Sequence, residues 1–183
     1  MKTRLRSDST LYGHLTIQVY DVKNGRRRRI LRMSNKNLVT NLAREAVLAL
    51  LAQDAAGTIL QANPVYNQIW ALVVGSDSTP PAITDTSLYT EQGRYQLTVP
   101  TEREYVIVPP NIFEIHVHKE IAAGTLTGIT VAEAGLYTRG DNDNPALAAN
   151  QILYARQIHP AFVKSATMAV EYDWRCGMLV QLP

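Results

Sequence analysis

Alternating apolar and polar residues predict a strand near the start of the chain. In GHLTIQVYDV, residues 13–22, Leu15, Ile17 and Val19 alternate with polar neighbours, the period-two pattern of a half-buried strand. Asn24-Gly25 follows, a dipeptide that favours the tight turn of a hairpin. We therefore expect a return strand from Arg26 to Met33, with Asp21 opposite Arg28.

A helical pattern follows this hairpin. In LAREAVLALLAQ the apolar residues Leu42, Ala46 and Leu50 recur at helical spacing, and Thr40 or Asn41 can cap the first turn. The apolar stripe is wide, which is typical of a helix that lies against a sheet. One helix is expected at about residues 40–53.

Short β-rich segments dominate the rest of the chain, each bounded by Gly, Pro, Asn or Asp. They are IWALVVG, RYQLTV, YVIVPP, FEIHVHKEI, LTGITVAEAGLYT, QILYARQI and MAVEYDWRCGMLV. Several such strands after one early helix predict a mainly β protein, a jelly-roll-like β-sandwich with the helix packed on it. The expected organisation is a basic N-terminal arm at residues 1–13 and a single domain at residues 14–183.

Composition narrows the class of protein. The chain has 183 residues, a formal charge of +2 and a single cysteine, Cys176. One cysteine excludes an intramolecular disulfide and a multi-cysteine metal site, and it suits assembly in a reducing compartment such as the cytosol. The basic N-terminus lacks the apolar core of a signal peptide, and no run of about 18 apolar residues follows, so neither export nor a membrane span is expected.

Two segments are candidates for metal binding. Strand alternation places Glu114, His116 and His118 on one face, where two imidazoles and a carboxylate are possible metal ligands. The sequence indicates no further metal ligand elsewhere. The simpler interpretation is that these three side chains form a partly exposed strand face. The acidic run at residues 141–145, DNDNP, lacks the glycine and the distant glutamate of a calcium loop and is typical of a turn. We expect no metal and no cofactor.

The run Arg26, Arg27, Arg28 and Arg29 is the most basic part of the sequence. In a strand these side chains point alternately to two faces, and no aromatic stacking platform is interleaved with them. A solvated or subunit-facing hairpin, a possible contact arm, is therefore favoured over a nucleic-acid site.

No motif indicates catalysis. Cys176 lies in WRCGML without a partner motif, and the chain has no Gly-x-Ser-x-Gly turn, phosphate-binding glycine loop or His-Glu-x-x-His. We expect no enzymatic activity.

The order of the segments resembles a group of tailed-bacteriophage virion proteins, found as tail-fibre attachment domains and as small collar, neck or baseplate components. NLVTNLAREAVLALLA is similar to their early Ala/Leu helix element, and IWALVVGSDSTPPAITDTSLYTEQGR to their strand, "VG" and "DT.L..E..R" element. ITVAEAGLYT and ILYARQIHPAFVKSATMAVEYDW are similar to their "E.GL" strand, then "L.AR", a Lys and a closing strand. The resemblance covers about residues 15–180.

This resemblance implies a structural β-sandwich that assembles as a symmetric homo-oligomer on the virion and contacts other virion proteins. The positions that match the pattern are Glu133, Gly135, Leu136, Arg94 and Arg156. A strand glutamate such as Glu133 is costly to bury without a partner, which an arginine such as Arg94 or Arg156 can supply. Gly135 is expected to allow close backbone approach or a bulge.

The chain stops at Pro183, just after the last predicted strand, whereas fibre proteins continue into a long shaft. We therefore expect a collar, neck or baseplate component, or an adapter on which a separate fibre docks. A carbohydrate- or metal-binding β-sandwich is the alternative class, and it would require a convergent polar or aromatic cluster.

Overall fold

The alternation that begins at Leu15 turns one face of the first strand into the core. The computed structural model describes residues 10–36, 38–39, 69–98, 100–108, 112–138 and 151–179. Strand β1 (Thr10–Lys23) buries Leu15, Ile17 and Val19 almost completely, while the residues between them stay partly or fully exposed. The sequence pattern therefore sets which face of β1 is inside.

Strand β1 forms the predicted hairpin with β2 (Arg26–Lys36). Asn24 and Gly25 both have positive φ, 51° and 73°, as the favoured two-residue hairpin turn requires. Asp21 lies opposite Arg28, as expected. A register shift beside Val19 and Tyr20 interrupts the pairing and increases the local twist of the ribbon.

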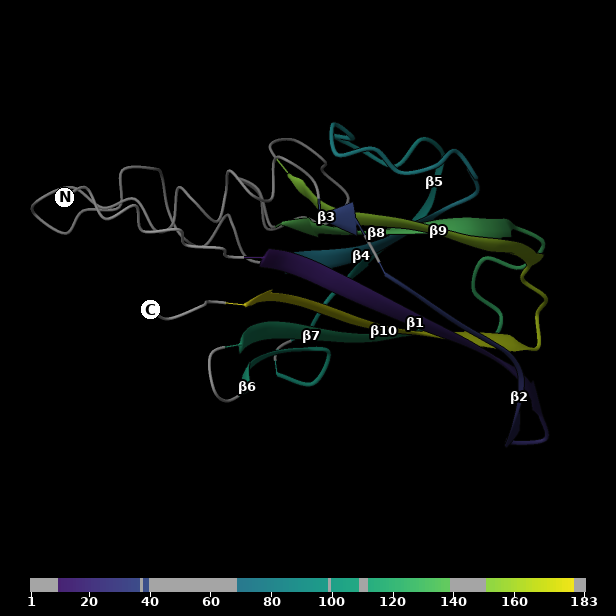
Figure 1. The fold of residues 1–183 in the computed structure, drawn as a ribbon. Helices are drawn as coiled ribbons and strands as arrows, with labels where there is room; N and C mark the ends of the chain where they lie inside the picture. The colour runs from purple at the N-terminus through teal and green to yellow at the C-terminus, as the bar shows by residue number, and fades with distance from the viewer. Residues whose placement is uncertain are drawn as a thin grey trace, which may run out of the picture.

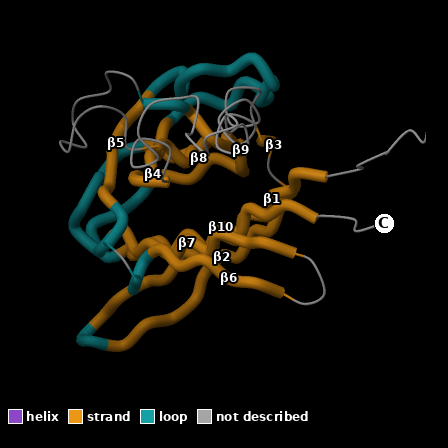
Figure 2. Tube along the Cα trace, turned by 90° about the vertical axis from the view of Figure 1, so that its left-hand side faces the viewer, coloured by secondary structure: helices purple, strands orange, loops and turns teal. Residues whose placement is uncertain are grey.

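In the described part of the chain, ten strands form two five-stranded sheets, which lie as two layers in Figures 1 and 2. Sheet A has the order β2-β1-β10-β7-β6, with β10 (Met168–Leu179), β7 (Ile112–Ile121) and β6 (Arg103–Val108). Sheet B has the order β3-β9-β8-β4-β5, with β3 (Leu38–Val39), β9 (Leu153–Val163), β8 (Thr130–Thr138), β4 (Ile69–Gly75) and β5 (Glu91–Gln96). All of the pairings are antiparallel.

Strand β10 occupies the centre of sheet A. It pairs with β1 from Thr10↔Leu179 to Asp21↔Met168, and on its other side with β7. Trp174 and Tyr172 on its inner face are completely buried and are the two largest apolar side chains of the core. Burial of this much apolar surface between the layers is the main stabilising contribution to the sandwich.

Sheet B is covered on both faces. Its inner face contributes Leu72, Val74 and Leu136 to the core shared with sheet A. Its outer face carries a second apolar cluster that includes Val73 and Leu153, and Leu88 of the β4–β5 loop packs on it. This explains why the burial pattern of β8 is almost continuous, eBBBBBBBB, instead of alternating.

The mainly β prediction is confirmed, and every later β-rich segment of the sequence contains a strand. Residues 10–13, assigned by pattern to the N-terminal arm, belong to β1, while residues 1–9 and the expected helix at about residues 40–53 lie outside the described residues. The described part of the chain holds no helix long and apolar enough to span a bilayer.

Candidate functional site

Two of the residues that match the virion-protein pattern, Glu133 and Arg156, meet on the outer face of sheet B. Glu133 on β8 and Arg156 on β9 are both completely buried there. Arg156 Nε donates to Glu133 Oε2 at 2.9 Å, and Nη2 lies 2.8 Å from the same oxygen. The arginine expected beside Glu133 is therefore Arg156, in the short geometry of a charge-assisted pair.

The same guanidinium also fixes the β4–β5 loop. Its Nη1 donates to Asp85 Oδ2 at 2.9 Å and its Nη2 to the carbonyl oxygen of Thr79 at 3.0 Å. The Tyr89 ring covers the guanidinium at 4.6 Å from its centroid, a cation–π contact. All three nitrogens of Arg156 thus have partners inside the protein, and the cluster is closed to a substrate.

Glu133 and Asp85 accept further hydrogen bonds from the loop backbone. The Thr90 amide donates to Glu133 Oε1 at 3.2 Å, and the Ala82 amide donates to Asp85 Oδ2 at 2.9 Å. These bonds satisfy carboxylate oxygens that would otherwise be costly to bury. We call Asp85, Glu133 and Arg156 the buried triad; it holds the loop on sheet B.

Two glycines make room for this arrangement. A Cβ added to Gly75 would lie 2.6 Å from the carbonyl oxygen of Thr90 and 2.8 Å from Glu133 Cγ. A Cβ added to Gly135 would lie 2.5 Å from Leu88 Cδ1. Gly135 therefore permits close approach, as the sequence indicated, although the partner is a loop side chain. Leu136 points the other way, into the core.

Arg94 on β5 does not reach Glu133. Its Nε and Nη2 donate to the two oxygens of Glu91 at 3.0 and 2.6 Å, and its guanidinium lies 4.4 Å from the centroid of the Tyr137 ring. It also donates to the side chain of Gln151. The Tyr137 hydroxyl in turn accepts a hydrogen bond from the Leu88 amide at 2.8 Å. Arg94 therefore supports the same loop at its β5 end.

Asp85 and Leu88 also belong to this site, although neither was predicted as a site residue. Both are fixed letters of the quoted "DT.L..E..R" element, which also supplies Glu91 and Arg94. The spacing of this element in the sequence therefore marked the residues. Its local pattern does not show that the loop packs against β8 and β9.

The other charged surface is the outer face of sheet A, which carries an open groove of about 800 Å³. Residues of β2, β1, β10, β7 and β6 line it, together with the loop after β5. The lining residues are His14, Thr16, Gln18, Arg32, Pro100, Thr101, Glu102, Arg103, Glu104, Glu114, His116, Val117, His118, Asp173, Trp174 and Arg175.

The candidate ligands Glu114, His116 and His118 lie on this groove, on one face of β7 as predicted. His116 is bonded to Glu114 and lies 3.4 Å from Glu104, whereas His118 Nδ1 bonds Asp173 Oδ1 at 2.6 Å. The imidazoles thus turn to different carboxylates. Among the described residues no group of three or more such side chains is placed to hold a metal.

The groove also includes His14, which appeared isolated in the sequence. Its Nε2 is 2.9 Å from the hydroxyl of Ser34, and it lies opposite Arg175 of β10. Residues 14 and 116 share the groove because β10 pairs with both β1 and β7. This neighbourhood depends on long-range pairing and has no local sequence signal.

The four arginines of the hairpin divide into two pairs, as alternation predicted. Arg27 donates to Glu120 at 3.2 Å and to Glu171 at 2.7 Å and lies over the Tyr20 ring, and Arg29 donates to Gln18. Arg26 and Arg28 are exposed and form no hydrogen bond or close ion pair within the described residues, although Arg28 lies opposite Asp21 and interacts with it electrostatically. Two of the four cations are therefore available for an external contact.

One further buried cation closes the end of the sandwich. Lys164, the lysine of the quoted pattern, is completely buried and donates to the carbonyl oxygens of Ala122 and Met168 at 2.8 and 2.7 Å. Burial lowers the pKa of the Lys164 amine. Cys176 is a buried core residue, and the acidic run at residues 141–145 lies outside the described residues.

Comparisons with protein-family models, curated proteins and solved structures found no significant match.

Proposed function

We propose that this protein is a non-enzymatic structural component of a tailed-phage virion. In this proposal it forms or joins a symmetric ring, or a fibre-attachment point, at the collar, neck or tail baseplate. It would be assembled in the host cytoplasm as a homo-oligomer that contacts other virion proteins.

The observation that carries the proposal is the convergence of the pattern residues. Gly75 of "VG", Asp85 of "DT.L..E..R", Glu133 of "E.GL" and Arg156 of "L.AR" come from four separate segments and meet in and around the buried triad. One arrangement of contacts therefore explains why these four short motifs occur together. This supports the proposal that the chain shares a structural scaffold with the virion proteins that have the same order of motifs.

The chemistry of this arrangement favours a scaffold role. The triad is enclosed by the β4–β5 loop, its one guanidinium is paired with both carboxylates, and Arg156 is completely buried. A catalytic group must reach a substrate, whereas a buried and fully hydrogen-bonded ion cluster holds a loop in one position.

The alternative, a carbohydrate- or metal-binding sandwich, would use the groove on sheet A. Sugar recognition commonly relies on an exposed aromatic ring, but Trp174 in the groove lining has its side chain fully buried in the core. The groove histidines are bound to separate carboxylates. The groove is thus better suited to a charged protein surface than to either ligand.

The test is the location of the protein. We expect mass spectrometry of purified particles to detect the chain at several copies per virion, and gold-labelled antibody to mark the neck or the tail. Particles from a phage with the gene disrupted should lack a defined tail or collar part, and plasmid expression should restore it. Absence of the protein from purified particles would overturn the proposal.

A further inference from the structure

We propose that the basic tip of the β1–β2 hairpin docks into the acidic side of the sheet A groove on a second copy of this chain. The inference rests on the homo-oligomer of the proposed function and names the contact that builds it. The hairpin tip is residues 21–29.

The first element of the contact is the free charge on the hairpin. The hairpin extends beyond the two layers in Figure 1, and residues 23–32 are all exposed. Arg27 is held by Glu120 and Glu171, whereas Arg26 and Arg28 form no hydrogen bond or close ion pair in the described part of the chain, although Arg28 lies opposite Asp21 and interacts with it electrostatically. Alternation places these two cations on one side of the ribbon.

The second element is the distribution of charge in the groove. Its β6–β7 side and the neighbouring loop carry Glu102, Glu104 and Glu114, and Asp173 lies on β10, while Arg32 of β2 and Arg175 of β10 also line the groove. Lys119 compensates Glu102, whereas the partners of Glu104, Glu114 and Asp173 are the imidazoles of His116 and His118. The side chains of Glu104 and Asp173 are 59% and 41% exposed. Exposed carboxylates in a concave site attract a cationic partner and raise its local concentration.

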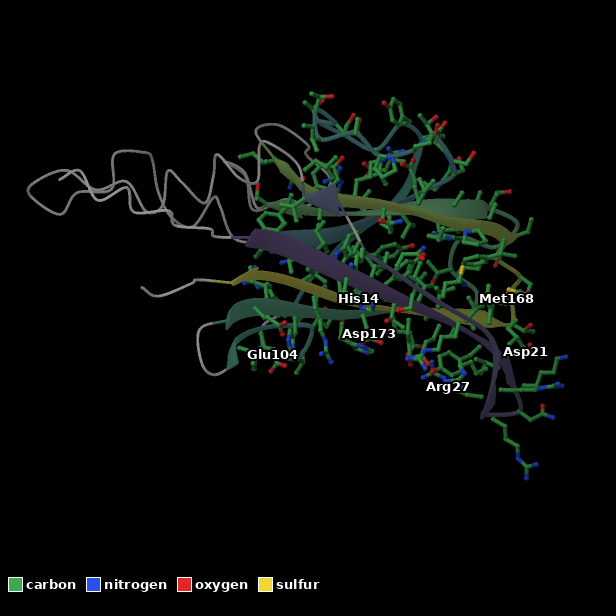
Figure 3. The ribbon with its side chains drawn as sticks, in the orientation of Figure 1. His14, Asp21, Arg27, Glu104, Met168 and Asp173 are labelled. Atoms are coloured by element: carbon green, nitrogen blue, oxygen red, sulfur yellow. The ribbon has the colours of Figure 1, made fainter. Side chains whose placement is uncertain are left out.

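The two elements cannot meet within one molecule. Glu104 lies in the same cross-strand row as His14, through His116 and Arg175. His14 and Lys23 are nine residues apart on β1, which is about 30 Å at the rise of a strand. Figure 3 accordingly shows Arg27 and Asp21 at one end of sheet A and Glu104 well away from them.

An intermolecular contact between two different surface patches is heterologous, and it generates rings when the rotation between copies closes. Each copy offers one tip and one groove, so every copy in such a ring is equivalent. Arginine is well suited to the contact because its planar fork binds carboxylates in a bidentate manner. The exposed Ile30 and Leu31 beside the tip add apolar contact area.

Charge reversal tests the contact on the full chain. Variant one carries Arg26→Glu and Arg28→Glu, and variant two carries Glu104→Lys and Asp173→Lys. In sedimentation velocity over a concentration series, each variant alone should associate about tenfold or more weakly than the wild type, because like charges then face each other. Circular dichroism and thermal melting establish that both variants fold.

Mixing the variants provides the decisive result. In an equimolar mixture the acidic tip of variant one faces the basic groove of variant two, and the basic tip of variant two faces the acidic groove of variant one. Association should therefore return towards the wild-type value. Lys36→Glu, which changes the charge of β2 away from the tip, should not weaken association.

Three outcomes would overturn the docking contact: wild-type protein that stays monomeric, variants that associate like the wild type, or a mixture that shows no recovery. If the protein is nevertheless found in virions, the proposed function stands and the contact alone is wrong. Tight binding of the tip to duplex DNA, with no self-association, would identify a nucleic-acid partner and also overturn the contact.

Discussion

Arg156 links three parts of the chain that are far apart in sequence: β9, Glu133 of β8 and Asp85 of the β4–β5 loop. Removing one partner from a buried ion cluster is more damaging than replacing the whole cluster, because the remaining charges lose their compensation. Substitutions in the buried triad are therefore expected to lower stability strongly.

Substituting Arg156→Met should lower the free energy of unfolding by about 3–5 kcal/mol, because Glu133 and Asp85 stay buried without their cation. Arg27→Met is the matched control, since Arg27 also binds two carboxylates but its side chain is 38% exposed. Its cost should be about 1 kcal/mol or less. Urea denaturation followed by tryptophan fluorescence measures both.

The double variant Glu133→Gln, Arg156→Met should recover part of the loss, because the amide keeps the acceptor for Thr90 and removes one unpaired charge. Equal stability losses for Arg156→Met and Arg27→Met would show that the triad is not a structural centre.

Glycine substitutions should separate two kinds of crowding. Gly75→Ala forces a Cβ against the Thr90 carbonyl oxygen and buried Glu133, neither of which can move easily, whereas Gly135→Ala meets mainly the end of the Leu88 side chain. We expect Gly75→Ala to be the more destabilising of the two. It should lower the free energy of unfolding by more than the usual cost of overpacking, which is about 1–3 kcal/mol. Thermal unfolding measures the order of the two variants, and the reverse order would contradict the assignment of Leu88 as the yielding group.

His159 gives the protein a defined response to acid. Its side chain is buried, its Nε2 has no hydrogen-bond partner in the described structure, and burial lowers the pKa of the imidazole. Below an ordinary histidine pKa of about 6.5, His159 is protonated in the unfolded chain but stays neutral in the folded chain. The free energy of unfolding therefore falls as the pH decreases.

The variant His159→Leu should lose less stability than the wild type between about pH 6.5 and 5. Above that window the two should differ little, because Leu fills a similar volume and the Pro160 carbonyl that His159 contacts belongs to an exposed residue. Denaturant titrations at several pH values make the comparison. Parallel pH profiles would exclude His159 as the source of the acid response.

Among the elements, those with a clear local pattern were predictable from sequence. The hairpin of β1 and β2, its Asn24-Gly25 turn and the two faces of β7 follow from alternation and turn chemistry. The boundaries of β5 were less accurate, since the strand is Glu91–Gln96 and not residues 94–99. Its mixed polar sequence has no apolar alternation to mark where it starts.

The pairing between elements was not predictable in the same way. The neighbours of β10 and the loop that covers sheet B depend on contacts between residues more than 40 positions apart, such as Asp85 with Arg156 and Thr90 with Glu133. A charged residue in a strand indicates that a partner is needed, but only the fold decides which one. Hence Arg94 and Arg156 remained equal candidates for Glu133 until the strands were placed.

At the hairpin, replacing Arg26, Arg27, Arg28 and Arg29 together by Ser should leave the fold intact. Only Arg27 is tied to carboxylates, and exposed pairs of this kind contribute about 1 kcal/mol or less. Circular dichroism should be unchanged, and the unfolding midpoint should shift slightly. Unfolding of this variant would mean that the hairpin is part of the stabilising core.

The molecule as a whole has two unlike faces. Sheet B is covered by its own loop through the buried triad and Leu88, whereas the outer face of sheet A carries the groove and a projecting basic hairpin. A protein with one closed and one open face can add neighbours in one direction without aggregating on the other, which suits a component of an ordered assembly.

The central place of β10 has a consequence for how the chain is made. Strand β1 is complete at Lys23, but its partner β10 begins only at Met168. At a translation rate of about 5–20 residues per second, roughly 7–30 s pass between the synthesis of β1 and the start of β10. Strand β7 also lacks this partner until β10 is made. Once β7 is complete at Ile121, we expect sheet A to consist of two separate hairpins with unpaired inner edges until β10 is made. Rapid overexpression should therefore favour strand exchange between neighbouring nascent chains, and slower synthesis at low temperature should raise the yield of correctly folded protein.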